Sequence, residues 1–357
     1  MSEALEPRDN PDLIGQEAAE HAFLQAWESG RLAHAWLLTG PRGIGKATLA
    51  FRIARFALSG GAAPAAGLFG DAEPATLQMS TDHSIFRRVA SGGHADFKLI
   101  ERGWADDKQS RRKSEITIDE VRDVGGFLSL TPAEGGWRVV IVDAADEMNR
   151  NSANAILKIL EEPPKRALLL LVSHSPGRLL PTIRSRCRRL AMPPLSHAVV
   201  TKLIRQHQPE MAEDEAAALA TLAGGSIGRA LALHAQGGLS LYAEMLALLE
   251  KLPQLPIGAL HDFSDRIGRQ ADDIALFGEL LTGWLADAAA AAAGGPRRAV
   301  LEGEAETQQR LVLRTGLERW AAIWEKIGTL FERADAVNLD GKQVVMSAFL
   351  TLEKACK

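Results

Sequence analysis

Cysteine is scarce in this chain, with only Cys187 and Cys356 among 357 residues. Two cysteines so far apart can build neither a disulfide framework nor a four-cysteine zinc site, so a reducing compartment is expected. The longest apolar stretches, 168–172 and the alanine run 288–293, are much shorter than the roughly 20 residues of a membrane-spanning helix. The polar, acidic residues 1–15 show no secretory signal pattern. The composition therefore predicts a soluble, cytoplasmic protein.

An excess of charge of one sign is also absent, because 41 Lys and Arg stand against 45 Asp and Glu and the net charge is −4. A protein whose whole surface binds nucleic acid has a strongly basic balance. No recognition-helix signature or basic domain is visible in the sequence either. A sequence-specific DNA-binding regulator is therefore disfavoured.

The first 192 residues alternate short apolar runs with helical patterns. Nearly continuous apolar runs bounded by turn residues predict strands buried on both faces of a parallel sheet, at 34–40, 137–145 and 167–173. Apolar residues at helical spacing predict helices at 46–58, 117–130 and 151–161. Because strand and helix patterns alternate, residues 1–192 are expected to form one α/β domain.

Pro193 and Pro194 interrupt this pattern, and little strand character follows them. Residues 193–238 carry short helical patterns and predict a small helical lid. From 239 to 357 apolar residues recur at helical spacing, which predicts an all-helical C-terminal domain. The chain is thus expected to have three domains.

Residues 40–46 (GPRGIGK) follow a predicted strand and open a predicted helix, which is the context of a Walker A phosphate loop. The glycines of such a loop let backbone N–H groups wrap a phosphate, and its lysine, here Lys46, reaches the β- and γ-phosphates. The glycines expected to line the nucleotide are Gly40, Gly43 and Gly45.

The loop lacks the hydroxyl that should follow its lysine and bind Mg²⁺, because Ala47 stands in that position. Thr48 comes one residue later, about 100° further round the helix, and should not simply replace it. Thr48 is kept as a candidate nucleotide-site residue. The loop can still hold an anion, but its metal site is damaged, and no metal is assigned to this chain.

The acidic half of the site is incomplete as well. The run WRVVIVDAADEM (137–148) ends its apolar part in Asp143, the expected Walker B carboxylate, and the next residue is Ala144 instead of the water-polarising glutamate. Glu147 is too far along the chain to serve in the same geometry. Phosphoryl transfer needs Mg²⁺ and an oriented nucleophile, so no intrinsic ATPase activity is expected. Lys46, the glycines and Asp143 still permit weak binding of ATP or ADP.

Five stretches of the sequence resemble the clamp-loader branch of the AAA+ superfamily, in particular the δ′ subunits of bacterial DNA polymerase III. They are HAWLLTGPRGIGK (34–46), MNRNSANAILKILEEPP (148–164), LPTIRSRC (180–187), GGSIGRAL (224–231) and NLDGKQVVMSAFL (338–350). The resemblance covers essentially the whole chain, and the pair LEEPP and SRC is specific to clamp loaders. It implies an AAA+ P-loop NTPase core, a helical lid and an all-α collar through which subunits oligomerise.

The resemblance also implies roles for single residues. Arg186, in the SRC motif 185–187, corresponds to the arginine finger that enters the ATP site of an adjacent subunit; without the resemblance it would be one of several arginines on a solvated edge. Ser173 occupies the sensor-1 position, although an ordinary serine at a strand end is an equal reading. Arg229 occupies the sensor-2 position of the lid, as a phosphate ligand or a vestige.

The sequence departs from the family in informative ways. Many members hold a four-cysteine zinc module after the Walker A helix, and the corresponding segment here has no cysteine, so no zinc is expected. Motor subunits (τ/γ) keep intact Walker motifs, so Ala47 and Ala144 argue against that identity. The C-terminal helices resemble the collar, and their tryptophans serve either that interface or the intrachain core: Trp284, Trp320 and Trp324.

The leading hypothesis is therefore a non-hydrolysing scaffold subunit of a clamp-loader hetero-pentamer, beside the δ subunit and the τ/γ motors. It would supply Arg186 to a neighbouring ATP and help load the sliding clamp onto primer-template DNA. The alternative is an active AAA+ ATPase, a motor subunit of a clamp loader or of a related DNA-processing complex. Measurable turnover by the isolated chain would support that alternative.

Overall fold

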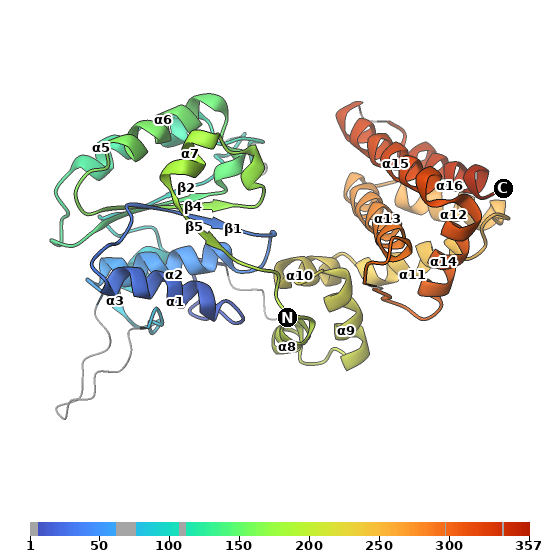
Figure 1. The fold of residues 1–357 in the computed structure, drawn as a ribbon, viewed down its shortest axis with the longest axis horizontal. Helices are drawn as coiled ribbons and strands as arrows, with labels where there is room; N and C mark the ends of the chain where they lie inside the picture. The colour runs from blue at the N-terminus through green and yellow to red at the C-terminus, as the bar shows by residue number, and fades with distance from the viewer. Residues whose placement is uncertain (1–5, 62–75, 107–111, 297, 338) are drawn as a thin grey trace. The chain divides into compact units, whose positions relative to one another are not determined.

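The computed structural model describes the chain except for residues 1–5, 62–75, 107–111, 297 and 338, and it gives no side-chain description for 335–337 (Figure 1). The described chain divides into two compact units. The first comprises 1–209 with 224–229, and the second 210–223 with 230–357. Residues 193–238, expected to form a separate lid, are shared between the two units, and the three-domain division stays a prediction.

The first unit contains a five-stranded sheet in the order β2-β3-β4-β1-β5, in which every neighbouring pair is parallel. The three central strands confirm the three strands predicted from sequence: β1 (Ala35–Thr39), β3 (Arg138–Asp143) and β4 (Ala167–Ser173). All of β4 is buried, which explains its continuous apolar run, since both faces of the sheet are covered. The α/β parallel-sheet core expected for residues 1–192 is confirmed.

Two edge strands were not predicted, β2 (Phe97–Ile100) and β5 (Arg188–Ala191). Each is four residues long, too short for a period to be recognised. In β5 only Leu190 is buried, because an edge strand pairs on one side and exposes much of its surface to water. Because β5 contains two exposed arginines, its sequence does not show the apolar pattern from which a strand is predicted.

Helices cover both faces of the sheet (Figure 1). One face carries α1 (Glu17–Glu28), α2 (Lys46–Leu58) and α3 (Ser84–Ala90). The other carries α4 (Ile118–Val121), α5 (Val124–Ser129), α6 (Arg150–Glu161) and α7 (Pro181–Arg186). The single helix expected at 117–130 is thus two short ones, interrupted by a turn at Arg122 and Asp123. Gly125 and Gly126 lie within α5.

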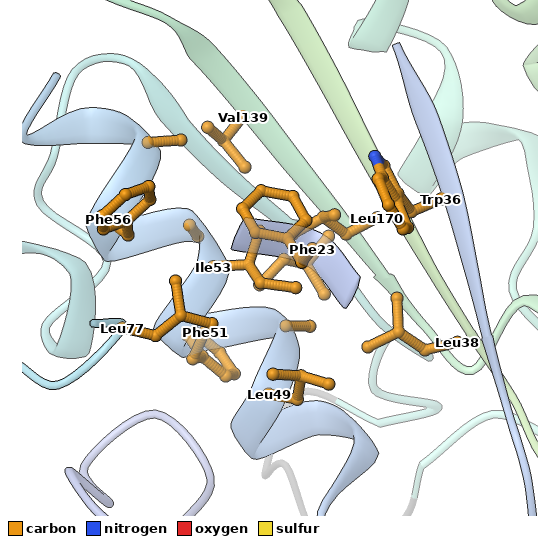
Figure 2. Close-up of a cluster of buried hydrophobic side chains, with 14 of the residues drawn as sticks. Phe23, Trp36, Leu38, Leu49, Phe51, Ile53, Phe56, Leu77, Val139 and Leu170 are labelled. Carbon is orange, nitrogen blue, oxygen red and sulfur yellow. The ribbon is translucent and has the colours of Figure 1, made fainter. Parts of the chain in front are cut away.

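Successive residues of β1 serve opposite cores, as a strand requires. Trp36 belongs to the cluster under α1 and α2, and Leu37 to the cluster under α6 and α7. Figure 2 shows the first cluster, where Phe23 of α1 lies beside Trp36 with ring centroids 5.2 Å apart, and Ile53 of α2 packs close by. The two cores fix the sheet between its helices, so the loops at its carboxyl edge have a rigid support.

The second unit is helical. It contains α9 (Glu213–Leu222), most of α10 (Ile227–Ala235), α11 (Gly238–Leu249), α12 (Ile257–Ile267), α13 (Ala271–Ala292), α14 (Glu304–Thr315), α15 (Leu317–Val337) and α16 (Gly341–Cys356), whereas α8 (His197–His207) belongs to the first unit. Trp284 and Trp320 are 1% and 0% exposed and pack together, while Trp324 is 42% exposed. Two of the three tryptophans are therefore intrachain core.

The helix α13 corrects one expectation from composition. It has 22 residues and, in the described part of the chain, is the single unbroken helix long and apolar enough to cross a membrane by length and composition. The apolar stretches looked too short because the alanine run 288–293 was read apart from the residues before it. Leu281, Trp284 and Leu285 of α13 are at most 1% exposed, which is the burial of a core helix.

Candidate functional site

The phosphate loop connects β1 to α2, as predicted, and close packing against its glycines leaves no room for side chains. Gly40 and Gly43 have φ of +153° and +75°. A Cβ on Gly40 would stand 2.2 Å from the Met192 carbonyl oxygen, and a Cβ on Gly43 2.4 Å from Ser226 Oγ. Gly45 is the N-cap of α2 with φ +97°. The loop is glycine-rich here because neighbouring segments of the chain press against it.

Lys46 is 3% exposed, and its ammonium binds its own loop. It donates to the Gly40 carbonyl at 2.7 Å and also to the Pro41 carbonyl. Burial lowers the Lys46 pKa to about 8, although the carboxylates of Asp143 and Asp146 oppose this shift. A phosphate would therefore have to compete with two carbonyl oxygens for this lysine.

The predicted sensor-2 segment lies directly on the phosphate loop. The Gly228 N–H donates to the Gly43 carbonyl at 3.0 Å, and a Cβ on Gly228 would be 2.9 Å from the Gly43 Cα. Ser226 is 3% exposed and accepts from the Arg229 N–H at 3.1 Å. The backbone of Arg229 is thus held beside the loop through Ser226.

The hydroxyl missing after Lys46 is not restored by its neighbour. Thr48 is 7% exposed and lies on the buried side of α2, whereas Ala47 is partly exposed. Two successive helical residues point about 100° apart, so the hydroxyl of Thr48 faces the core. The position from which a Walker A hydroxyl binds Mg²⁺ is held by a methyl group.

Asp143 ends β3 as the Walker B motif requires. Burial raises the pKa of its carboxyl to about 6, with Glu101 and Glu147 adding to the effect and Lys46 and Arg42 opposing it. A carboxyl of raised pKa in this position is a weakened metal ligand, because metal ions bind the deprotonated form.

Ala144 is 3% exposed, and the next glutamate along the chain is engaged elsewhere. Glu147 accepts from Arg42 Nη2 at 3.1 Å through one oxygen and from Arg102 Nε at 2.9 Å through the other. The carboxylate of Glu147 therefore ties the phosphate loop to the segment after β2. No carboxylate follows Asp143 directly.

Asp146 and His174 also shape the site, and the sequence reading missed both. Asp146 accepts from the N–H groups of His174 at 2.9 Å and Ser175 at 3.0 Å. Burial opposes its ionisation, but the His174 N–H holds the pKa of the Asp146 carboxyl below its ordinary value. Burial lowers the His174 pKa to about 4, helped by Lys46 and Arg42. The sequence signal for Asp146 was its place as the second aspartate of the run DAAD (143–146), which had no assigned role.

Ser173, the sensor-1 candidate, ends β4 and is fully buried. The sheet register pairs it with Thr39, the residue before the phosphate loop. The topology therefore brings Ser173 to the same sheet edge as Lys46 and Asp143. Its burial makes it part of the support under the site.

Arg186 closes α7 on a different part of the first unit. Its Nη2 lies 2.9 Å from Glu161 Oε1, and its Nη1 donates to the Thr182 carbonyl at 3.2 Å. Its side chain is 36% exposed, while the helix is anchored by the fully buried Ile183. Burial raises the pKa of the partly buried Cys187 thiol to about 12, which disfavours its thiolate.

The neighbouring arginines are bound in other ways. The Arg188 guanidinium lies 4.7 Å from the centre of the Trp36 ring, and Arg189 Nε donates to Thr39 Oγ1 at 3.2 Å. These contacts hold the edge strand β5. Among the residues that the structure describes, no group of three or more His, Cys, Asp or Glu is placed to hold a metal ion.

A family model described as DNA polymerase III, delta subunit, matches residues 15–196. The chain is 38% identical over 227 residues to the DNA polymerase III subunit delta′ of Pseudomonas aeruginosa, covering 64% of this chain and 63% of that protein. It is 34% identical over 189 residues to the subunit delta′ of Bacillus subtilis, covering 52% of this chain and 50% of that protein. The matches thus span about half to two thirds of the length of these curated relatives.

Among solved structures, a DNA polymerase III gamma subunit-related protein of Thermotoga maritima aligns with 94% of this chain and all of its own, at 18% identity and a TM-score of 0.38. Membership of a family is therefore judged from the sequence comparisons. Since the family model covers half of the chain, the chain belongs to the DNA polymerase III delta subunit family, in its δ′ branch.

Proposed function

We propose that this chain is a clamp-loader subunit of bacterial DNA polymerase III that does not hydrolyse ATP. It supplies Arg186 to the ATP site of a neighbouring subunit and helps to load the sliding clamp onto primer-template DNA in the cytoplasm. The observation that carries the proposal is the contrast between a phosphate loop whose lysine binds its own carbonyls and an exposed arginine at the end of α7.

The absence of hydrolysis follows from three features of the phosphate site. Ala47 offers Mg²⁺ no hydroxyl, and Ala144 offers the attacking water no base. Glu147 is paired with two arginines. Phosphoryl transfer depends on the metal and on an oriented nucleophile, so removing both leaves at most weak binding of ATP or ADP. The subunit then requires no cofactor of its own, and no zinc.

The action of Arg186 in trans is supported by its exposure and chemistry. Its side chain is 36% exposed, so a partner can reach it. A guanidinium stays charged and offers a planar set of N–H donors suited to a phosphate. An arginine finger raises the rate of phosphoryl transfer by about 10³–10⁵.

The proposed partners follow from the family. Relatives of this chain include the DNA polymerase III subunit gamma/tau of Mycobacterium tuberculosis and the subunit tau of Escherichia coli. We place this chain in a hetero-pentamer with the δ subunit and the τ/γ motors, with the helical residues 239–357 as the collar. Leu313, Leu317 and Trp324, exposed on α14 and α15, suit such a contact.

The test is the ATPase of a reconstituted clamp loader, stimulated by clamp and primed DNA, with wild-type chain or Arg186→Ala. Arg184→Ala, an exposed arginine of the same helix, is the matched control. We expect Arg186→Ala to remove the turnover of the neighbouring site and to slow clamp loading. The Arg184→Ala complex should behave as wild type, and the isolated chain should show no turnover. Motor-like turnover by the isolated chain, with Arg186→Ala unchanged in the complex, would establish the alternative of an active ATPase.

A further inference from the structure

We infer that Glu161 is a positioning residue for Arg186, holding its guanidinium ready for a phosphate supplied by another subunit. The inference rests on the proposed function, because it gives the finger a partner within its own chain. Glu161 closes α6 and Arg186 closes α7, so 25 residues of sequence separate two helix ends that meet through one ion pair.

The C-terminal ends of α6 and α7 are both anchored in the core. α6 is held by Ile156 and Leu160, which are 0% and 3% exposed, and α7 by Ile183, which is 0% exposed. All three belong to the same core cluster. The Glu161 carboxylate therefore reaches Arg186 from a well-packed helix, and its contact favours one direction for a long side chain that would otherwise populate many rotamers.

The Arg186 guanidinium has more N–H donors than its contacts with Glu161 and Thr182 use. A guanidinium has five N–H donors. Glu161 takes one on Nη2 at 2.9 Å, and the Thr182 carbonyl takes one on Nη1 at 3.2 Å. The Nε–H and one N–H on each terminal nitrogen are left for a ligand. A lysine held in the same way would keep no planar pair of donors.

The place of Glu161 in its helix points the same way. Glutamate at a helix C-terminus is unfavourable, because the last turn carries partial negative charge from unpaired carbonyls and favours cations. Helix stability therefore does not explain this residue. The pair with Arg186 does, and its exposure, 36% for Arg186 and 51% for Glu161, makes it weak enough to adjust when a phosphate arrives.

The experiment uses the reconstituted clamp loader with Glu161→Ala and Glu161→Gln. Glu162→Ala, which removes the next exposed carboxylate, is the control. We expect Glu161→Ala to lower kcat about threefold to tenfold, the coupling typical of contacting residues, with an unchanged KM for ATP. Glu161→Gln keeps an oxygen acceptor and should retain most of the activity. Glu162→Ala should behave as wild type.

Two further measurements separate positioning from support of the fold. Glu161→Ala in the Arg186→Ala background should cause no additional loss of kcat, and Glu161→Ala should not lower the melting temperature of the isolated chain. An equal loss in both backgrounds, a lowered melting temperature, or a kcat that is unchanged or rises in Glu161→Ala overturns the inference while Arg186→Ala still impairs the complex. If Arg186→Ala has no effect, the proposed function itself fails.

Discussion

The phosphate loop and the end of α7 lie in the same unit, and each carries one cation to which the proposed function refers. Lys46 is 3% exposed and donates to carbonyls of its own loop. Arg186 is 36% exposed and is held by a carboxylate and one carbonyl. A buried cation with fixed neutral partners is occupied by its own loop, whereas an exposed one with spare donors can serve a ligand. The comparison teaches that a cation can be occupied by its own loop in one place and stay available to a ligand in another.

The largest expected effect concerns Arg186, the exposed cation of the two. Arg186→Lys keeps the positive charge but loses the planar fork, so we expect most of the arginine's contribution to disappear, a fall of about 10²–10³ in the rate at the neighbouring ATP site. Single-turnover hydrolysis by the reconstituted complex measures it. A lysine variant with wild-type rate would mean that charge alone matters, and would weaken the role assigned to Glu161.

The next effect concerns packing on the phosphate loop. Gly43→Ala places a Cβ 2.4 Å from Ser226 Oγ at φ +75°, and we expect it to cost about 1–3 kcal/mol of unfolding free energy. Gly126→Ala is the control, because open space surrounds its Cβ within a helix, and it should stabilise by about 0.5–1 kcal/mol. Urea unfolding followed by circular dichroism checks both. Equal effects of one sign would show that the segment 224–229 does not press on the loop.

A smaller effect tests the buried cation. The folded-state pKa of Lys46 is lowered to about 8, so between about pH 8 and 10.5 the unfolded chain binds more protons and stability rises with pH. Below pH 8 the charged lysine costs stability. Lys46→Met should therefore be more stable than wild type by about 1–2 kcal/mol at pH 7, and this advantage should vanish toward pH 10.5. An advantage that is independent of pH would refute the assignment.

The smallest effect concerns Asp143. Its pKa is raised to about 6, so the folded chain binds more protons than the unfolded chain between about pH 4 and 6, and stability falls as pH rises through that window. Asp143→Asn should flatten this part of the pH profile and be more stable than wild type by about 1 kcal/mol at pH 7. Chemical unfolding at intervals of pH measures the difference. If the two profiles run parallel, another group is responsible.

The central strands could be predicted because burial on both faces demands continuous apolar residues. The same rule cannot find edge strands, and β2 and β5 were missed. The helix expected at 117–130 is two helices in the structure, because a period of apolar residues does not report a short turn such as that at Arg122 and Asp123. Family membership was predicted from five short motifs and was confirmed by a family model over residues 15–196.

The candidate site could be predicted residue by residue but not as an arrangement. Lys46, Asp143 and Ser173 meet at one sheet edge because parallel strands end together, which topology implies. That Gly228 binds the phosphate loop, or that Glu147 binds Arg42, depends on segments 185 and 105 residues away from their partners in sequence. No local pattern encodes such pairs.

The sequence by itself determined which atoms are present: alanine in place of a Mg²⁺ ligand and of a base, an arginine in an SRC motif, and apolar runs that must be buried. These are properties of single residues and short periods. Only the tertiary structure decided what each charged group contacts. Lys46 turns to its own loop and Arg186 to Glu161, because a charge is stabilised by whichever partners the packed core brings within hydrogen-bond distance.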